Sequence, residues 1–354
     1  MRIGLLRHLV CPACRDRLRP APPPASDQEV IEEGELRCAG CARSYSIVKG
    51  VPRCLVTDVA AATITARTRR QYDFAWRRFG LREIEEGWEK DSARYLSLIP
   101  GELLGRPGSL GLDAGCGGGA DLLRIAERGA EVIGVDLSEG VESASRATAH
   151  LPNVHVVQAD IHRLPFPPGL FDFAYSFGVL HHLPDPSRGF TAIAELLKPG
   201  APLITYLYED FSDRSAMERT ALRVVRAVRR VTSRAPGPIL LALCWVAVPA
   251  VWLAFSLPAR MLLRPFPRLA GRLPFRHTLR WPVLASDLFD RFSPAIEWRF
   301  SSRGLMELYR IAGFQAVEMR RYRGWVSWGF KRDRTATAGD DDARRAVLDS
   351  MARG

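Results

Sequence analysis

The chain has 354 residues, of which 25 % are charged and 47 % hydrophobic, so it can form one large or two smaller domains, and its composition excludes a disordered protein. Its formal net charge is +11, and residues 211–285 carry the whole excess, because this segment contains 13 Arg, no Lys and 2 acidic residues. The neutral remainder argues against a nucleic-acid-binding surface along the whole chain.

The N-terminal region contains four of the seven cysteines, in two Cys-x-x-Cys knuckles. Cys11 and Cys14 form the first, and Cys38 and Cys41 form the second after 23 intervening residues, a spacing that predicts one closed, tetrahedral, structural zinc site. A disulfide pair is the alternative. Met1–Val10 holds two Arg and a His and lacks the apolar core of a signal peptide, so we expect a cytoplasmic protein in a reducing compartment.

The sequence around these cysteines is also informative. Leu-Val-Cys-Pro-Ala-Cys, followed by Tyr45-Ser-Ile and Gly50-Val-Pro, resembles the small zinc ribbons of the tRNA-methyltransferase activator family. The resemblance implies a zinc-binding domain over residues 1–58 that acts together with a methyltransferase.

A helix is predicted next, over Thr63–Leu81, within a helical extension of residues 59–105. Tyr72 and Trp76 are four residues apart and therefore share one face of this helix. That face is either an aromatic core stripe or a surface that contacts a ligand.

Residues Leu110–Asp121 combine an apolar strand, an acidic residue and a glycine loop that opens a helix. No Gly-Lys-Ser/Thr follows, which excludes a P-loop, and the carboxylate of Asp113 is unsuited to a pyrophosphate. An acid at this position instead favours a ligand with a cationic end.

This stretch resembles the first motif of the class I S-adenosylmethionine-dependent methyltransferases, which it matches with Asp113, Gly115, Gly117 and Gly119. The resemblance implies that S-adenosylmethionine is bound by these four residues and by Cys116 within the loop.

Further matches follow in the order of the family motifs. The resemblance places Asp136 at the ribose hydroxyls and Asp160 at the adenine amino group, and it identifies Phe171–Leu183 as the fourth motif. It also implies that the helix before the first motif closes over the cofactor. The further cofactor-binding residues that we predict are Tyr72, Trp76, Asp136, Leu137, Asp160, Ile161, Ser176 and Phe177.

His181 and His182, in the fourth motif, are candidate catalytic bases, because a hydroxyl acceptor must lose a proton as the methyl group arrives. The family repeats a histidine pair here in enzymes with unlike acceptors. Packing and hydrogen bonding below the cofactor pocket are therefore the alternative role.

Residues 211–285 form an insert after the predicted fifth strand. Ala216–Arg234 has apolar residues on one face and arginines on another, which predicts a basic amphipathic helix that contacts a membrane surface or a partner. Ile239–Leu257 contains 19 residues without a charge, enough to span a bilayer. Pro249 predicts a break into two pieces, so we expect a re-entrant or interfacial hairpin.

Arginines then recur every four residues, at Arg260, Arg264, Arg268, Arg272, Arg276 and Arg280. For residues 216–280 as a whole, two interpretations stay open: contact with the anionic headgroups of a membrane, or a soluble lid over a hydrophobic acceptor pocket. Nucleic acid is less favoured, because arginines on phosphates do not explain the uncharged stretch.

By resemblance the fold class is α/β, with a seven-stranded Rossmann-like sheet in the order 3-2-1-4-5-7-6 that ends in an antiparallel hairpin. The predicted methyltransferase core covers residues 106–210 and 286–333. Residues 334–354 are predicted to be a mobile tail.

The expected activity is S-adenosylmethionine-dependent methyl transfer to a hydrophobic small molecule, lipid or lipid-linked glycan, by a cytoplasmic enzyme that is peripheral at the inner face of the membrane. One alternative is a base methyltransferase for rRNA or tRNA, since a zinc ribbon ahead of this fold also resembles the 23S rRNA guanine methyltransferases. Their second knuckle usually includes a His, which this chain lacks. A non-catalytic scaffold that binds the cofactor is the second alternative, and the acids Asp113, Asp136 and Asp160 argue against it.

Overall fold

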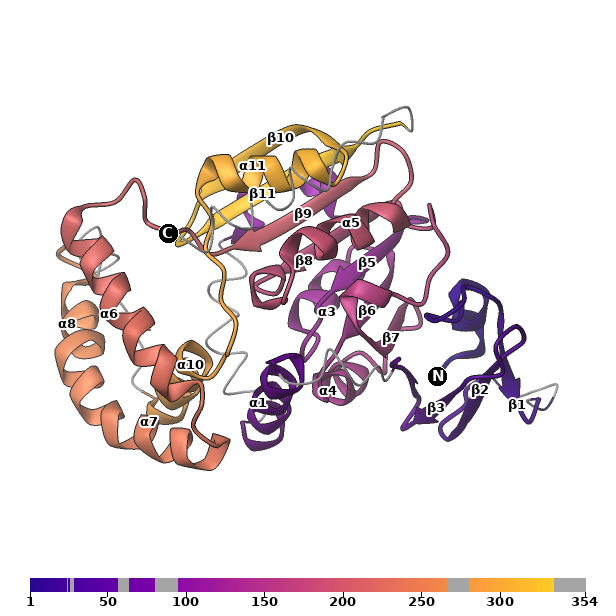
Figure 1. The fold of residues 1–354 in the computed structure, drawn as a ribbon, viewed down its shortest axis with the longest axis horizontal. Helices are drawn as coiled ribbons and strands as arrows, with labels where there is room; N and C mark the ends of the chain where they lie inside the picture. The colour runs from indigo at the N-terminus through magenta and orange to yellow at the C-terminus, as the bar shows by residue number, and fades with distance from the viewer. Residues whose placement is uncertain (24, 26–28, 57–63, 80–94, 267–279, 334–354) are drawn as a thin grey trace. The chain divides into compact units, whose positions relative to one another are not determined.

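The computed structural model describes residues 1–23, 25, 29–56, 64–79, 95–266 and 280–333 (Figure 1). Contacts divide the chain into two compact units. The sheet unit comprises Met1–Thr65, Tyr95–Asp213 and Ile296–Gly354, and the helical unit comprises Ala66–Arg94 and Arg214–Ala295. The predicted tail, residues 334–354, lies outside the described residues.

The centre of the sheet unit is a run of apolar parallel strands. Buried side chains alternate between the two faces: Leu112 and Ile133 contribute to one apolar cluster, whereas Val132 and Tyr175 contribute to the other. The strands are β5 (Leu110–Ala114), β6 (Glu131–Asp136), β7 (Val154–Ala159), β8 (Phe173–Phe177) and β9 (Pro202–Leu207), with the hairpin β10 (Phe314–Arg321) and β11 (Trp325–Lys331).

These seven strands follow the order β7-β6-β5-β8-β9-β11-β10, which is the predicted order 3-2-1-4-5-7-6. β11 pairs antiparallel with both β9 and β10, as the predicted terminal hairpin requires. Three helices lie between consecutive parallel strands, namely α3 (Ala120–Ala126), α4 (Gly140–Ala147) and α5 (Pro186–Leu196), and α11 (Ser302–Ile311) precedes β10. Their apolar residues belong to the clusters on the two faces of the sheet. The short 3-10 segments of this unit are η1 (Ile3–His8), η3 (Gly101–Leu104), η4 (Ile161–Arg163) and η5 (Leu180–His182).

The prediction of seven strands is wrong, because the sheet has eleven. The four additional strands, β1 (Leu18–Ala21), β2 (Gly34–Cys38), β3 (Ser44–Val48) and β4 (Val51–Cys54), belong to residues 1–54, which we call the cysteine ribbon. They form an antiparallel meander, and β4 then pairs parallel with β7 through Arg53 opposite Gln158 and Cys54 opposite Ala159. A pairing between strands about a hundred residues apart leaves no local signal in the sequence.

The helical unit has an apolar core of its own. Leu240, Cys244 and Val248 of one helix pack with Leu288 and Phe289 of another. The helices are α1 (Ile64–Arg78), α6 (Ala216–Thr232), α7 (Gly237–Val251), α8 (Leu257–Leu262) and α10 (Trp281–Phe292), with a π-helical segment η6 (Trp252–Ser256) between α7 and α8.

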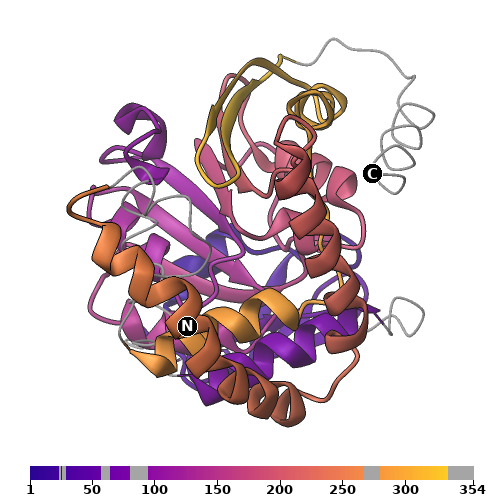
Figure 2. The same ribbon diagram turned by 90° about the vertical axis from the view of Figure 1, so that its left-hand side faces the viewer.

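The predicted break at Pro249 is wrong. α7, η6 and α8 follow one another without interruption as one helix, Gly237–Leu262, which Figure 2 shows from a second direction. Pro249 removes one backbone donor, yet Val248 beside it is fully buried in the unit's core, so packing maintains the helix. The π-helical turn follows, where the Leu257 N–H donates to the Trp252 carbonyl.

The predicted basic amphipathic helix is confirmed as α6, whose N-terminus is fixed by a capping box between Ser215 and Glu218. The arginine series after α8 is described in part. Arg260, Arg264 and Arg280 are exposed, and the members of the series at positions 268, 272 and 276 lie outside the described residues.

Candidate functional site

The glycine loop after β5 adopts a backbone that only glycine accepts readily. Gly115, Gly117 and Gly119 have φ values of +105°, +48° and +92°. A Cβ atom at Gly115 would lie 2.3 Å from Cγ2 of Val179, so a side chain is also excluded by space. The loop therefore brings bare backbone to the start of α3 at the carboxyl edge of the sheet, where ligands bind in open α/β folds.

Three carboxylates gather at this edge. Asp113, the penultimate residue of β5, is buried, and burial, followed by the negative charges of Asp121 and Asp136, raises its pKa well above its ordinary value. Burial also raises the pKa of Asp121, whose Oδ2 accepts a 2.6 Å hydrogen bond from the Tyr95 hydroxyl. A buried group of acids at raised pKa values is stabilised by a cationic ligand.

Asp136, the last residue of β6, is held by its neighbours. Its Oδ2 accepts from the Gly117 N–H at 3.0 Å, and its Oδ1 accepts from the Ser138 N–H at 2.8 Å and the Ser138 hydroxyl at 2.6 Å. The carboxylate thus ties the glycine loop to the β6 end. Sequence reasoning missed Ser138, although a buried serine two residues after a strand-end acid suits an Asx-type turn.

Asp160 follows β7 and caps η4. Its Oδ1 accepts from the His162 N–H at 2.9 Å and lies 3.0 Å from the His162 Nδ1. Burial opposes the charge of Asp160, but the hydrogen bonds and charge of His162 lower its pKa overall, and in turn Asp160 raises the pKa of His162 despite burial. The sequence did not single out His162 as the partner of this acid.

The other residues predicted around the cofactor are mostly core residues. The Ser176 hydroxyl, fully buried, donates to the Ala114 carbonyl at 2.7 Å. Phe177 packs 5.0 Å from Tyr95 between ring centroids. Burial also extends to Cys116 and Ile161, whereas Leu137 is half-buried.

His181 and His182 lie in η5, directly after β8. The His181 ring is fully buried, 4.0 Å from the Tyr208 ring and 4.2 Å from the His182 ring between centroids. His182 is half-buried, and its Nδ1 lies 2.6 Å from the Ile296 carbonyl. Of the two, His182 is the more accessible.

Tyr72 and Trp76 lie on α1, in the helical unit, and both are half-buried. The other cofactor residues predicted from the sequence lie in the sheet unit. The predicted closure of the aromatic pair over the cofactor stays a prediction.

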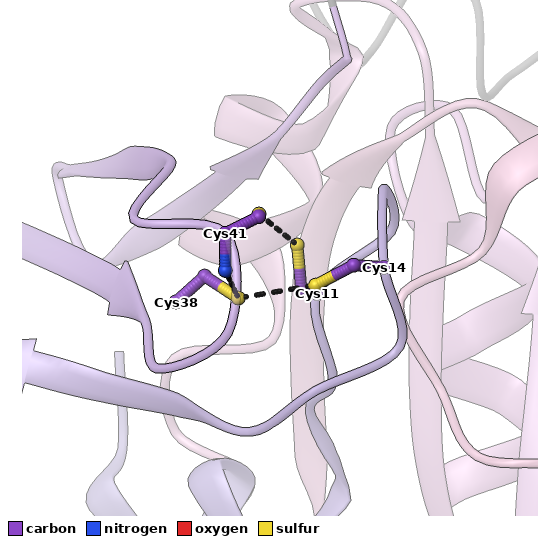
Figure 3. Close-up of side chains that lie close together, drawn as sticks. All are labelled: Cys11, Cys14, Cys38 and Cys41. Carbon is purple, nitrogen blue, oxygen red and sulfur yellow. Dashed lines mark hydrogen bonds between the residues drawn. The ribbon is translucent and has the colours of Figure 1, made fainter.

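The four knuckle cysteines converge at one point of the cysteine ribbon (Figure 3). Their sulfur atoms all lie within 4.8 Å of one another, with Cys11 3.7 Å from Cys41 and Cys14 3.3 Å from Cys38. A tetrahedral zinc with Zn–S bonds of ~2.3 Å needs sulfurs ~3.8 Å apart, so the cluster is compatible with structural zinc. All seven cysteines are free thiols, and the disulfide alternative is not realised.

Two family models match the chain. Residues 112–205 match the one described as a methyltransferase domain, and residues 4–50 match the one described as Trm112p-like protein. The chain carries a methyltransferase domain and a Trm112p-like domain. The Trm112p-like match lies within the cysteine ribbon. The methyltransferase match runs from within β5 to within β9 and includes the glycine loop, Asp113, Asp136 and Asp160.

Curated relatives share part of the chain. An uncharacterized 37.1 kDa protein in transposon TN4556 of Streptomyces fradiae is 39 % identical over 150 residues, which cover 41 % of this chain and 43 % of that protein. A ubiquinone biosynthesis O-methyltransferase of Azoarcus sp. is 36 % identical over 100 residues, covering 27 % of this chain and 42 % of that protein. The chain therefore spans less than half the length of either relative.

Solved structures that match part of the chain include a complex that contains the Haloferax volcanii Trm112 methyltransferase activator. It is 16 % identical with a TM-score of 0.46, covering 76 % of this chain and 100 % of that chain. A geranyl diphosphate C-methyltransferase from Streptomyces coelicolor is 22 % identical with a TM-score of 0.32, covering 38 % and 51 %.

The Trm112p-like domain contacts the methyltransferase domain next to the candidate cofactor site. Arg15, directly after the first knuckle, donates to the carbonyls of Leu164 at 2.8 Å and Phe166 at 3.0 Å. Between them, the Pro165 carbonyl accepts from the Val10 N–H at 2.9 Å. These bonds hold the segment that follows Asp160, and the Arg15 backbone itself donates to the Cys11 carbonyl at 2.8 Å.

Proposed function

We propose that this protein is an S-adenosylmethionine-dependent methyltransferase that acts on a hydrophobic acceptor. The observation that carries the cofactor assignment is the buried acidic group around Asp113, beside a loop of left-handed glycines at the end of β5. S-adenosylmethionine carries a sulfonium and an ammonium, and a cationic ligand would offset the free-energy cost of burying these carboxylates.

Each acid has a distinct role in this proposal. Asp113 stabilises the cationic end of the cofactor. Asp136 accepts hydrogen bonds from the ribose hydroxyls, and Asp160 and Ile161 contact the adenine. A carboxylate offers about four acceptor positions, so the three bonds that Asp136 accepts from Gly117 and Ser138 leave about one position for a ribose hydroxyl, and a second hydroxyl would replace one of these bonds. When bound, S-adenosylmethionine supplies an already activated methyl group. The protein's own task is then to align donor and acceptor and to exclude water.

His181 and His182 take different roles. We propose that His181, fully buried against Tyr208, supports the pocket by packing. The half-buried His182 is the better candidate for accepting a proton from a hydroxyl acceptor.

The acceptor class rests on the helical unit. Its α7 and α8 are built almost entirely from apolar residues, and the surrounding segments are rich in arginine. We therefore propose a hydrophobic small molecule, lipid or lipid-linked glycan as acceptor, and a cytoplasmic enzyme that is peripheral at the inner face of the membrane. The four cysteines Cys11, Cys14, Cys38 and Cys41 would hold zinc in a structural role.

Calorimetry with S-adenosylhomocysteine tests the cofactor assignment. Asp113→Asn should weaken binding ~30-fold or more, because removing one partner of a buried charge pair costs ~2–5 kcal/mol. Asp172→Asn is the matched control: Asp172 precedes β8, at the opposite edge of the sheet, and pairs with Lys198 on the surface. Equal affinity of the Asp113→Asn variant and the wild type would refute the assignment.

A second experiment addresses the acceptor. The protein is incubated with methyl-labelled S-adenosylmethionine and fractionated lipid, RNA and small-metabolite extracts. Label in the lipid or apolar-metabolite fraction supports the proposal, whereas label in RNA would support a base methyltransferase. Cofactor binding with no label in any fraction would favour a non-catalytic scaffold.

A further inference from the structure

We propose that the helical unit docks in the plane of an anionic phospholipid bilayer through an outward-facing apolar surface on α6, α7 and η6. We call this the outer apolar face and define it by six exposed residues: Met217, Val224, Val231, Ile239, Val246 and Leu253. The inference rests on the membrane location proposed above, for which it names the surface and the lipid, and it holds whether or not the proposed methyl transfer is correct.

The apolar stripe of α6 points away from the core of its unit. Met217, Val224 and Val231 recur every seven residues, so they share one side of the helix, and they are 79 %, 58 % and 73 % exposed. The buried residues of α6 are instead Leu222 and Arg229, whose guanidinium donates to the Pro294 carbonyl at 2.9 Å. In a soluble protein the apolar stripe of a surface helix faces the core. In α6 it does not.

The long helix Gly237–Leu262 shows the same pattern more strongly. On one side Leu240, Cys244 and Val248 are buried in the unit's core. The opposite side is also apolar, and its Ile239 and Val246 are exposed. As a result, only 28 % of the most apolar 18 residues of this helix are buried. A helix that is apolar all round belongs in a protein core or in lipid. Among the described residues, this is the one helix that is long and apolar enough to cross a membrane.

Charge identifies the occupant of this face. The same helices carry exposed arginines, including Arg219, Arg223 and Arg230 on α6 and Arg260 on α8. Apolar side chains flanked by arginines match an interface of acyl chains beneath anionic headgroups. RNA would satisfy the arginines, but it offers nothing to the apolar side chains.

The helix packing favours a position in the plane of the membrane over a crossing. α10 occupies the inner side of α7, where Phe289 lies in the same apolar cluster as Leu240 and Leu241. Phe289 also contacts Phe74 of α1, with ring centroids 5.5 Å apart. If α7 crossed the bilayer, it would lose these contacts. If it lies in the plane of the membrane, it keeps them and lipid covers only its outer side.

Vesicle flotation of the full chain tests the proposal. Wild-type protein should float with vesicles of phosphatidylcholine and phosphatidylglycerol, and partition at least tenfold less into phosphatidylcholine alone. Val246→Glu should lower partitioning into the anionic vesicles at least tenfold. Arg223→Gln should lower it about fivefold, which is ~1 kcal/mol for one arginine near the surface. Met306→Glu is the matched control and should change nothing, because Met306 is an exposed apolar residue of α11 in the sheet unit.

Three results would overturn docking on the membrane, and a fourth would overturn its in-plane position. The first is protein that floats with neither vesicle. The second is a Val246→Glu variant that floats like the wild type while circular dichroism shows it folded. The third comes from a photo-cross-linking residue at position 246 in the presence of vesicles: a cross-link to phospholipid supports docking, whereas one to the sheet unit identifies a lid.

Alkaline carbonate extraction of vesicle-bound protein tests the in-plane position. Release by alkaline carbonate supports the in-plane position, and retention would mean that Gly237–Leu262 crosses the bilayer.

Discussion

The cysteine ribbon and the helical unit are both additions to the same sheet, and they are built differently. The ribbon continues the sheet through the pairing of β4 with β7, and it donates hydrogen bonds to the segment after Asp160. The helical unit encloses its own core around Phe289 and leaves a second apolar surface outside it. The ribbon, which pairs with the sheet, therefore supports the neighbouring part of the methyltransferase domain. The helical unit, which has its own core, can bind a different partner through its exposed apolar surface.

The largest effect should come from zinc. Removing it by chelation, or replacing Cys38 by Ser, should unfold the cysteine ribbon, because structural zinc supplies ~10–16 kcal/mol of apparent binding energy in small zinc domains. Hydrogen exchange should rise over residues 1–54 and over the segment Leu164–Phe166. The helices of the helical unit should keep their protection, since among the described residues their apolar cluster contains no residue of the ribbon.

Cys244→Ala is the control for that experiment, because Cys244 is a buried cysteine of the helical unit outside the knuckles. It should leave zinc content, measured by atomic absorption, at the wild-type level. If zinc removal left exchange over Leu164–Phe166 unchanged, the ribbon would not support the candidate site.

The next effect should be confined to the helical unit. Phe289→Ala removes a fully buried ring that contacts Phe74 and Phe79, and should cost ~3–5 kcal/mol of that unit's stability. Denaturant unfolding should then show two transitions, with zinc retained through the first. Phe266→Ala, at an exposed phenylalanine of the same unit, should leave the curve unchanged. A single transition shared by both units would contradict their independence.

A smaller effect should come from Arg15→Ala. The variant loses two hydrogen bonds from a charged donor, each worth ~1.5–3 kcal/mol at most, and loosens the segment after Asp160 without removing a cofactor contact. Affinity for S-adenosylhomocysteine should fall about tenfold by calorimetry, with zinc content intact. Arg37→Ala, at an exposed arginine of β2, should bind like the wild type. Unchanged affinity in the Arg15 variant would limit the ribbon to a stabilising role.

Much of the sheet could be predicted from the sequence because its signals are local. Asp113 and Asp136 lie at the carboxyl ends of two apolar strands, and parallel strands bring such ends to one edge. The glycine loop between β5 and α3 could also be predicted from the sequence, since its positive φ values favour glycine.

The remaining features depend on partners distant in the chain. Arg53 pairs with Gln158 in the sheet, and the Tyr95 hydroxyl donates a hydrogen bond to Asp121. No local sequence pattern in either pair of segments predicts that they meet. Pro249 was misjudged for a related reason: a local rule for helix breaking was outweighed by the burial of Val248, which only the folded unit shows.

The pairing of β4 with β7 also determines which strands form the margins of the sheet. All six residues of β7 are buried, including Val154, Val156 and Val157. In the described sheet the margins are instead β1, four residues long with Pro20, and β10, which is charged and interrupted by a bulge. Proline, bulges and charge discourage intermolecular strand addition. A truncated chain that begins after residue 54 would expose the edge of β7, a valine-rich strand. We therefore expect loss of the ribbon to cause aggregation.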